Sequence, residues 1–223
     1  MKRVVRIVGT LMILAGVGSL AWALTVWQWQ DPLTATLNYF DQRELSDTFD
    51  RRLEEGRPAA AAASAAAVRT SLPRSAVEWR RSSKPGDAVA RLRIPRLGLK
   101  GIIVNGTDPN SLKRGPGRYL GSAMPGEGEL VYVAGHRTTY GAPFSRIDKL
   151  QKGDRVFVEL PYATIEYAIT GHRIVAATEL SVLKSKGREE LALQACHPRF
   201  FASQRYIAYA KLVDVSPPAS SSA

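Results

Sequence analysis

The sequence begins with an apolar segment that can be buried in only a few ways. The 21 residues from Ile7 to Trp27 contain no charged side chain, and three basic residues precede them: Lys2, Arg3 and Arg6. A helix of about 20 apolar residues spans the ~30 Å hydrocarbon core of a bilayer. Positive charge before such a span places the N-terminus in the cytoplasm. We therefore expect a cytoplasmic stub and transmembrane signal anchor over residues 1–30.

A cleaved signal peptide is the alternative for this segment. The triplet Ala21-Trp22-Ala23 resembles the small-residue site at which signal peptides are cut. The apolar run is longer than a signal-peptide core and continues past that site. Tryptophans gather toward its far end, where an aromatic belt would lie. These features favour an uncleaved anchor, and both alternatives carry residues 31–223 out of the cytoplasm.

Residues 31–83 differ from the rest of the chain in composition and in the spacing of their apolar residues. Apolar residues spaced among charges up to Gly56 are typical of a surface or juxtamembrane helix. The low-complexity stretch RPAAAAASAAAVRTSLPRS follows, in which alanine favours helix but nothing is expected to bury a core. We interpret residues 31–83 as a partly helical or disordered linker that spaces a head domain from the membrane. A partner-binding helix over 33–55 is the alternative.

From residue 84 onward apolar and polar residues alternate, as in half-buried strands. Turn residues separate eight such segments: DAVARLRIPRLGL, GIIVNG, ELVYVAGH, DRVFVEL, ATIEYAIT, HRIVAAT, ELALQAC and RYIAYAKLV. About eight short strands without a long helical pattern indicate an all-β antiparallel sandwich or closed barrel over residues 84–215. Residues 216–223 are expected to be a disordered tail.

Charge and composition exclude some functions. The net charge is +11, but the basic residues are spread out, and no basic run exceeds two residues. A basic surface without interleaved aromatic residues does not predict nucleic-acid binding. One cysteine and three histidines without CxxC or HxxxH spacing predict no zinc site. We expect no cofactor, and a calcium site built from loop carboxylates stays open.

The single cysteine, Cys196, lies at the end of an expected strand. In ELALQAC, Leu191, Leu193 and Ala195 share one face, and Cys196 falls on the opposite face with Gln194. A free cysteine is commonly a small buried residue. A position off the core face favours an accessible thiol instead. In an exported protein such a thiol is a reactive group or an intermolecular link.

A nucleophilic thiolate needs a nearby cation and a proton donor. His197 adjoins Cys196, but neighbouring strand residues point to opposite faces. His136 ends an apolar strand and opens the polar loop HRTTYGAPF, as a residue at the rim of a scaffold would. His172 is expected in a solvated turn, so we favour His136. Arg205 opens the next strand and could stabilise an oxyanion beside the thiol.

Residues 86–213 resemble the sortases, membrane-anchored cysteine transpeptidases of mainly Gram-positive bacteria. The resemblance rests on ARLRIPRLGL, on GPGRYLGSAMPGEGELVYVAGHRTTYGAPFSRIDKLQKGDRVFVEL and on LALQACHPRFFASQRYIAYAKL. The segments AGHRTTYGAPF and ACHP are most similar to class E. The resemblance implies an eight-stranded β-barrel without a cofactor. It also implies that Cys196 is the nucleophile, that His136 is the general acid and then the base, and that Arg205 orients the substrate and supports the oxyanion.

The resemblance further implies cleavage of an LPxTG-like or LAxTG-like signal on an exported surface protein, between Thr and Gly. An amine, either a lipid-linked peptidoglycan precursor or a pilin lysine, then resolves the thioester. The family usually reads TLxTC, and this chain has Ala192 and Ala195 in place of both threonines, which leaves the sorting motif open. Two alternatives remain: an exported cysteine peptidase or amidase acting on wall peptides, and a non-catalytic wall-binding barrel.

Overall fold

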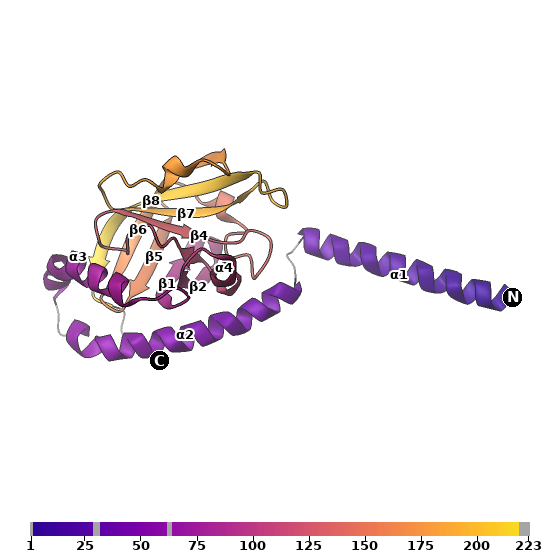
Figure 1. Ribbon diagram of the computed structural model, residues 1–223, viewed down its shortest axis with the longest axis horizontal. Helices are drawn as coiled ribbons and strands as arrows, with labels where there is room; N and C mark the ends of the chain where they lie inside the picture. The colour runs from indigo at the N-terminus through magenta and orange to yellow at the C-terminus, as the bar shows by residue number, and fades with distance from the viewer. Residues whose placement is uncertain (1, 29–31, 62–63, 219–223) are drawn as a thin grey trace.

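In the computed structural model, a closed β-barrel follows three long helices (Figure 1). The structure describes residues 2–28, 32–61 and 64–218. The long helices are α1 (Lys2–Gln28), α2 (Pro32–Ala61) and α3 (Ala65–Ser82). The strands close in the order β1-β2-β3-β4-β7-β8-β6-β5. The predicted eight-stranded barrel behind an N-terminal apolar helix is confirmed.

The strands of the barrel vary from two to fourteen residues in length. They are β1 (Ala88–Ile94), β2 (Leu99–Asn105), β3 (Gly117–Arg118), β4 (Leu130–Ala134), β5 (Arg155–Leu160), β6 (Ala163–Ala176), β7 (Glu190–His197) and β8 (Gln204–Ser216). Four short helical segments connect them: η1 (Pro95–Leu97), α4 (Pro109–Arg114), η2 (Ile147–Lys149) and η3 (Leu180–Leu183).

Two of the expected strands differ from the observed ones, although the total of eight is the same. The segments ATIEYAIT and HRIVAAT form one continuous strand, β6, whose register shifts between Ile169 and Gly171. A bulge therefore stands where a turn was expected. Strand β3 was not predicted, because two residues are too few to show alternation. Since β2–β3 and β4–β7 pair in parallel, the barrel is mixed and not purely antiparallel.

Strand β7 buries its inward face, whereas its outward face is fully buried only at Ala192. Leu191, Leu193 and Ala195 are fully buried in the main core inside the barrel. Ala192 points the other way, into a second apolar cluster with residues of β4, β6 and β8. The predicted alternation of core and non-core residues along β7 is therefore confirmed.

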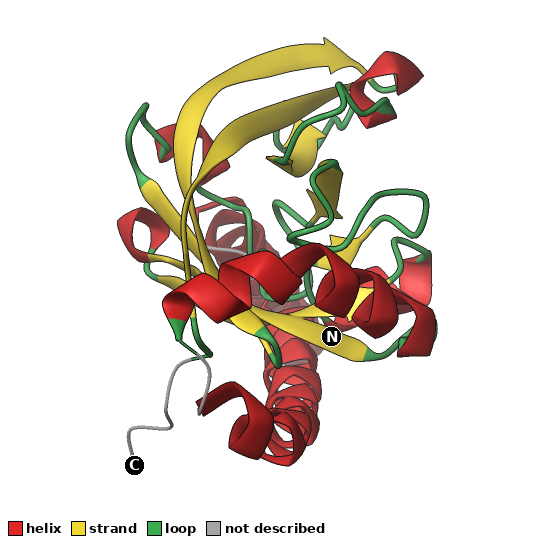
Figure 2. Ribbon diagram, turned by 90° about the vertical axis from the view of Figure 1, so that its left-hand side faces the viewer, coloured by secondary structure: helices red, strands yellow, loops and turns green. Residues whose placement is uncertain are grey.

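Helix α3 packs on the main core and lies across the front of the barrel in Figure 2. Val68, Leu72 and Ala76 are buried there, four residues apart, as one stripe of a helix. The Trp79 indole N–H donates to the carbonyl of Val89 at 3.0 Å. The expectation that the alanine-rich stretch buries no core is wrong, because its two large apolar residues lie on that stripe.

Helix α2 runs along the outside of β1 and β2 (Figure 1). Leu45, Phe49 and Leu53 form a separate buried cluster with side chains of those strands. Arg91 of β1 bonds Asp50 at 2.6 Å and Glu159 of β5 at 2.9 Å. The helix expected to end near Gly56 continues to Ala61.

The side chain of Gln42 takes the place of a missing strand beside β2. Its oxygen accepts from the Ile102 N–H at 2.7 Å, and its nitrogen donates to the carbonyls of Ile102 at 3.2 Å and Arg114 at 2.7 Å. Strand β3 pairs with β2 only at Val104 and Asn105, so the edge at Ile102 needs other partners. Any Cβ at Gly115 would collide with the Gln42 amide.

In their described parts, α2 and α3 thus both contact the barrel. The predicted division into a linker over residues 31–83 and a barrel domain over residues 84–215 stays a prediction. Strand β8 ends at Ser216, and residues 219–223 of the expected tail lie outside the described residues.

We predict that Phe49→Ala lowers the free energy of unfolding by about 3–5 kcal/mol, because it opens a cavity between α2 and the barrel. Phe49 is fully buried, whereas Phe40 on the same helix is 62% exposed. Phe40→Ala is the matched control and should change stability by no more than about 0.5 kcal/mol. Denaturant unfolding in detergent measures both. Equal effects would show that α2 does not pack on the barrel.

Candidate active site

The register of β7 with its two neighbours brings the three predicted residues to one edge of the sheet. Cys196 is directly paired with Arg205 of the antiparallel strand β8. On its other side β7 runs parallel to β4, and the last pair is Ala134 with Gln194. His136 and Cys196 each lie two residues further along their own segment than this last pair. The register therefore sets Arg205 directly across from Cys196 on one side, and brings the segment that leads to His136 alongside β7 on the other.

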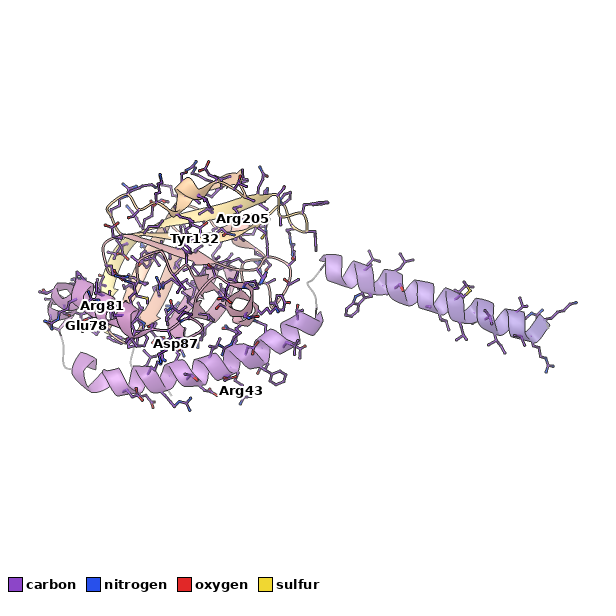
Figure 3. The ribbon with its side chains drawn as sticks, in the orientation of Figure 1. Arg43, Glu78, Arg81, Asp87, Tyr132 and Arg205 are labelled. Atoms are coloured by element: carbon purple, nitrogen blue, oxygen red, sulfur yellow. The ribbon has the colours of Figure 1, made fainter. Side chains whose placement is uncertain are left out.

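The outer face of these strands carries a hollow of about 200 Å³, and of the three predicted site residues only Arg205 lines it. Gln194, Ala134 and Arg205 line it, together with Tyr132 and residues of the segment 177–183. Tyr132 and Arg205 lie beside each other in Figure 3. Cys196 has the same parity as Gln194 and is partly exposed. Cys196 is thus off the core face, as predicted, and the accessibility of its thiol stays a prediction.

His136 begins the loop that follows β4 and is partly buried. Its ring lies 5.0 Å from the Tyr140 ring, and its Nδ1 lies 3.4 Å from the Thr139 hydroxyl. Its carbonyl accepts from the Phe144 N–H at 3.0 Å, which closes the loop. Burial lowers the pKa of His136 because it disfavours the charged imidazolium. Burial therefore favours the neutral imidazole, in which one ring nitrogen is an acceptor.

Arg205 is held by carbonyl groups of the β7–β8 connection. Its Nη1 donates to the carbonyls of Ala202 at 2.8 Å and Gln204 at 2.9 Å. No ion pair joins Arg205 to a carboxylate of the described residues. The guanidinium has five donors in all. Its charge is therefore available to a group in the hollow beside Cys196.

Arg137, which was not predicted from the sequence, joins the loop after β4 to the end of β7 behind the site. Only 5% of its surface is exposed, and its Nη2 pairs with Asp148 at 2.9 Å. Its Nη1 contacts the Cys196 carbonyl at 3.4 Å and His197 Nδ1 at 2.9 Å. Parity is the signal that could have found it. If His136 and Cys196 share one face, Arg137 and His197 share the other.

This contact fixes what His197 can do. A guanidinium only donates hydrogen bonds, so His197 Nδ1 accepts and the ring carries its proton on Nε2. Its acceptor nitrogen is thus occupied by Arg137 on the face opposite the thiol. The interpretation of His197 as a poor partner for Cys196 agrees with this geometry.

His172 shares the Tyr206 ring with His197, whose ring centroid lies 6.3 Å from that of Tyr206. His172 is in strand β6 and not in a turn as expected, because the two predicted segments run together. Its ring is exposed and stacks on Tyr206 at 4.8 Å. It is paired with Ala208 of β8, which is itself paired with Leu193. His172 is therefore two strands away from β7 and is not brought to Cys196.

Ala192 and Ala195, which replace the threonines usual in sortases, are both fully buried among apolar side chains. Ala195 belongs to the core inside the barrel, and Ala192 to the outer cluster with Tyr132 and Ile207. Both methyl groups therefore match their surroundings, where a hydroxyl would need a partner. Among the described residues, no group of three or more histidine, cysteine or acidic side chains is placed to hold a metal ion.

We predict that the neutral His197 ring carries its proton on Nε2, because Arg137 donates to Nδ1. Nitrogen-15 NMR of the imidazole groups distinguishes the two tautomers. Arg137→Met should remove this preference at His197 and leave the exposed His172 ring unchanged. A proton found on Nδ1 of His197 in the unaltered protein would contradict the assignment.

Comparison with known proteins points to one family. A family model for the sortase domain matches residues 92–213. Sortase D of Bacillus subtilis is 36% identical over 138 residues, which cover 59% of this chain and 68% of that protein. Sortase SrtE1 of Streptomyces coelicolor is 33% identical over 153 residues, which cover 61% of this chain and 43% of that protein.

Solved structures agree with the sequence relatives. The crystal structure of sortase E1 from Streptomyces coelicolor with a tripeptide in the active site superposes with a TM-score of 0.57 and 29% identity. It covers 61% of this chain and 94% of that chain. The resemblance to class E fits the SrtE1 match, although sortase D matches as well. Since the family model matches more than half of the residues, the chain belongs to the sortase family of cysteine transpeptidases.

Proposed function

We propose that this protein cleaves an LPxTG-like or LAxTG-like sorting signal of a substrate protein between Thr and Gly. It then transfers that substrate to an amine. The observation that supports this proposal is the strand register, which pairs Cys196 with Arg205 and aligns β4, two residues before His136, with Gln194 of β7. These three groups match a nucleophile, a proton carrier and an oxyanion stabiliser.

The proposed first half-reaction forms a thioester on Cys196. The thiol proton passes to His136, and the thiolate attacks the carbonyl carbon of the threonine. The Arg205 guanidinium stabilises the oxyanion that forms. The carbon–nitrogen bond then breaks, and His136 returns its proton to the departing glycine amine. In the second half-reaction an amine attacks the thioester, His136 takes up the amine proton, and the thiol is regenerated.

The hollow beside the site has the chemistry that such a signal needs. Aromatic and aliphatic side chains on its walls, including Tyr119, Tyr132 and Val182, suit the apolar side chains of a sorting motif. Gln194 and Thr107 supply hydrogen-bonding groups for a peptide backbone. An extended peptide in this hollow would lead to Cys196.

The proposed location is the cell membrane, with the barrel outside the cytoplasm. Among the described residues one helix, Lys2–Leu24, is long and apolar enough to cross a membrane, by length and composition alone. As an uncleaved single-pass anchor it would hold the enzyme near exported substrates and near a lipid-linked peptidoglycan precursor. A pilin lysine is the other proposed acceptor.

We predict that Cys196→Ala abolishes turnover and that His136→Ala lowers kcat by about 10²–10⁴-fold, because it removes the proton carrier. His172→Ala and His197→Ala are the matched controls and should retain most activity, since neither ring is placed to serve the thiol. Equal loss at His172 and none at His136 would overturn this assignment of roles.

The assay incubates the full chain in detergent with a sorting peptide, with and without an amine. Amine-dependent ligation and a thioester adduct on Cys196, seen by mass spectrometry, are expected. Cleavage that is indifferent to the amine would support an exported peptidase or amidase instead. Function that survives Cys196→Ala would support a non-catalytic wall-binding barrel.

We predict that His136 titrates below the ordinary histidine value of 6.5, since burial lowers its pKa. Its neutral form is therefore kept down to a lower pH than in a free histidine. Tyr140→Ala should raise this pKa toward 6.5, because it removes the ring packed 5.0 Å from the imidazole. NMR titration in the Cys196→Ala background measures both without a thiolate nearby. An unchanged midpoint in Tyr140→Ala would show that Tyr140 does not cause the shift.

A further inference from the structure

The first turns of α2 expose an apolar surface on the side that does not touch the barrel. Leu37 is 64% exposed, and Tyr39 and Phe40 are each 62% exposed. The Tyr39 and Phe40 rings meet edge to face at 5.7 Å. We call these three residues the α2 patch. Asn38, between them in sequence, is buried against the barrel and marks the opposite side of the helix.

The apolar character ends after these turns. From Arg43 to Glu55, the residues of α2 that are exposed are all charged: Arg43, Glu44, Asp47, Arg51, Glu54 and Glu55. Arg43 lies on the side of α2 that faces away from the barrel (Figure 3). The patch is therefore confined to the part of α2 nearest α1 in sequence.

Chain length ties the patch to the end of the apolar helix. Gln28 ends α1 and Pro32 begins α2. Four residue steps reach at most about 15 Å, and five helical residues to Leu37 add about 7.5 Å. Leu37 must therefore lie within about 23 Å of the end of α1, whatever path the chain takes.

The side chains in this position suit the interface of a bilayer. Aromatic residues are favoured at the level of the lipid head groups, and an adjacent arginine is attracted to anionic lipid. The acidic residues of the later turns would be repelled by the same surface. This charge distribution limits contact with lipid to the first turns of α2.

We propose that the α2 patch docks into the outer lipid interface, so that α2 is held between the bilayer and the barrel. The proposal rests on the proposed membrane anchor. Residues 31–83 would then hold the barrel close to the membrane, whereas the sequence predicted a spacer that holds it away.

The barrel-facing side of the same turns contacts the loop that carries His136. The Thr34 hydroxyl accepts a hydrogen bond from the Tyr140 N–H at 2.9 Å. At Gly141, where φ is +69°, a side chain would collide with Asn38. A helix with its side chains is about 10 Å across. Docking of the patch would therefore place this loop about one helix diameter from the head groups, near substrates that are still tethered in the membrane.

Site-directed spin labelling of the full chain in phosphatidylcholine/phosphatidylglycerol vesicles tests the docking. A Cys196→Ser background leaves a single thiol at each introduced position. Leu37→Cys reports on the patch, Asp47→Cys is the control on the same helix, and Val17→Cys reports on α1. Collision with oxygen marks a label in lipid, and collision with a nickel chelate marks a label in water.

We expect the label at position 37 to favour oxygen, as the label at 17 does, and the label at 47 to favour the chelate. A label at 37 that behaves like the one at 47, while 17 stays in lipid, would overturn the docking and leave the anchor intact. A label at 17 that favours the chelate would overturn the anchor, and the docking with it.

An activity measurement gives a second readout. The double variant Leu37→Glu/Phe40→Glu should ligate a soluble sorting peptide as the unaltered protein does. Its transfer of a substrate tethered by a membrane helix in the same vesicles should fall several-fold. Equal rates on the tethered substrate would count against the docking, and loss on both substrates would indicate damage to the fold.

Discussion

The parallel pairing of β4 with β7 is the constraint on which the candidate site depends. Parallel strands advance together, so two residues past the pair of Ala134 and Gln194 lie His136 and Cys196. The antiparallel strand β8 then sets Arg205 directly across from the cysteine. A slip of one residue between β4 and β7 would turn the side chains of one of these strands to the other face of the sheet. The fully buried Leu191 and Leu193 oppose such a slip, because it would place core residues outside the barrel.

The same register creates a second set of contacts on the opposite face. Arg137 and His197 follow His136 and Cys196 in sequence, so they meet behind the site, where Arg137 also pairs with Asp148. A buried guanidinium is costly unless it is paired, and its Nε has no partner among the described residues. The contacts of Arg137 with Asp148, with His197 and with the Cys196 carbonyl offset this cost. Arg137, which also contacts the Cys196 carbonyl, therefore joins the two segments that carry the proposed nucleophile and proton carrier.

Alternation along the strands predicted the barrel and the outward face of Cys196, whereas His136 was favoured for the loop it opens and Arg205 chiefly for the resemblance to sortases. Cys196 could be assigned to the outer face from Leu191 and Leu193 alone. The sequence pattern could not reveal β3, since two residues show no period. It also could not reveal the bulge that places His172 within β6. Arg137 was missed because nothing in a GHR triplet shows that the arginine is buried. The packing of α2 depends on Gln42 reaching a bare strand edge, which only the tertiary structure reveals.

The loop after β4 connects helix α2 to the candidate site. Tyr140 and Ala142 adopt left-handed backbone conformations, with φ of +51° and +40°, which cost free energy for residues other than glycine. Neighbouring contacts must hold such a loop. Phe144, fully buried in the main core, donates its N–H to the His136 carbonyl from within the barrel, and Thr34 of α2 binds the Tyr140 N–H from outside. Because the Tyr140 ring packs on His136, the position of α2 acts on the burial that lowers the histidine pKa. A helix outside the barrel thus contributes to the environment of a group proposed to carry the proton.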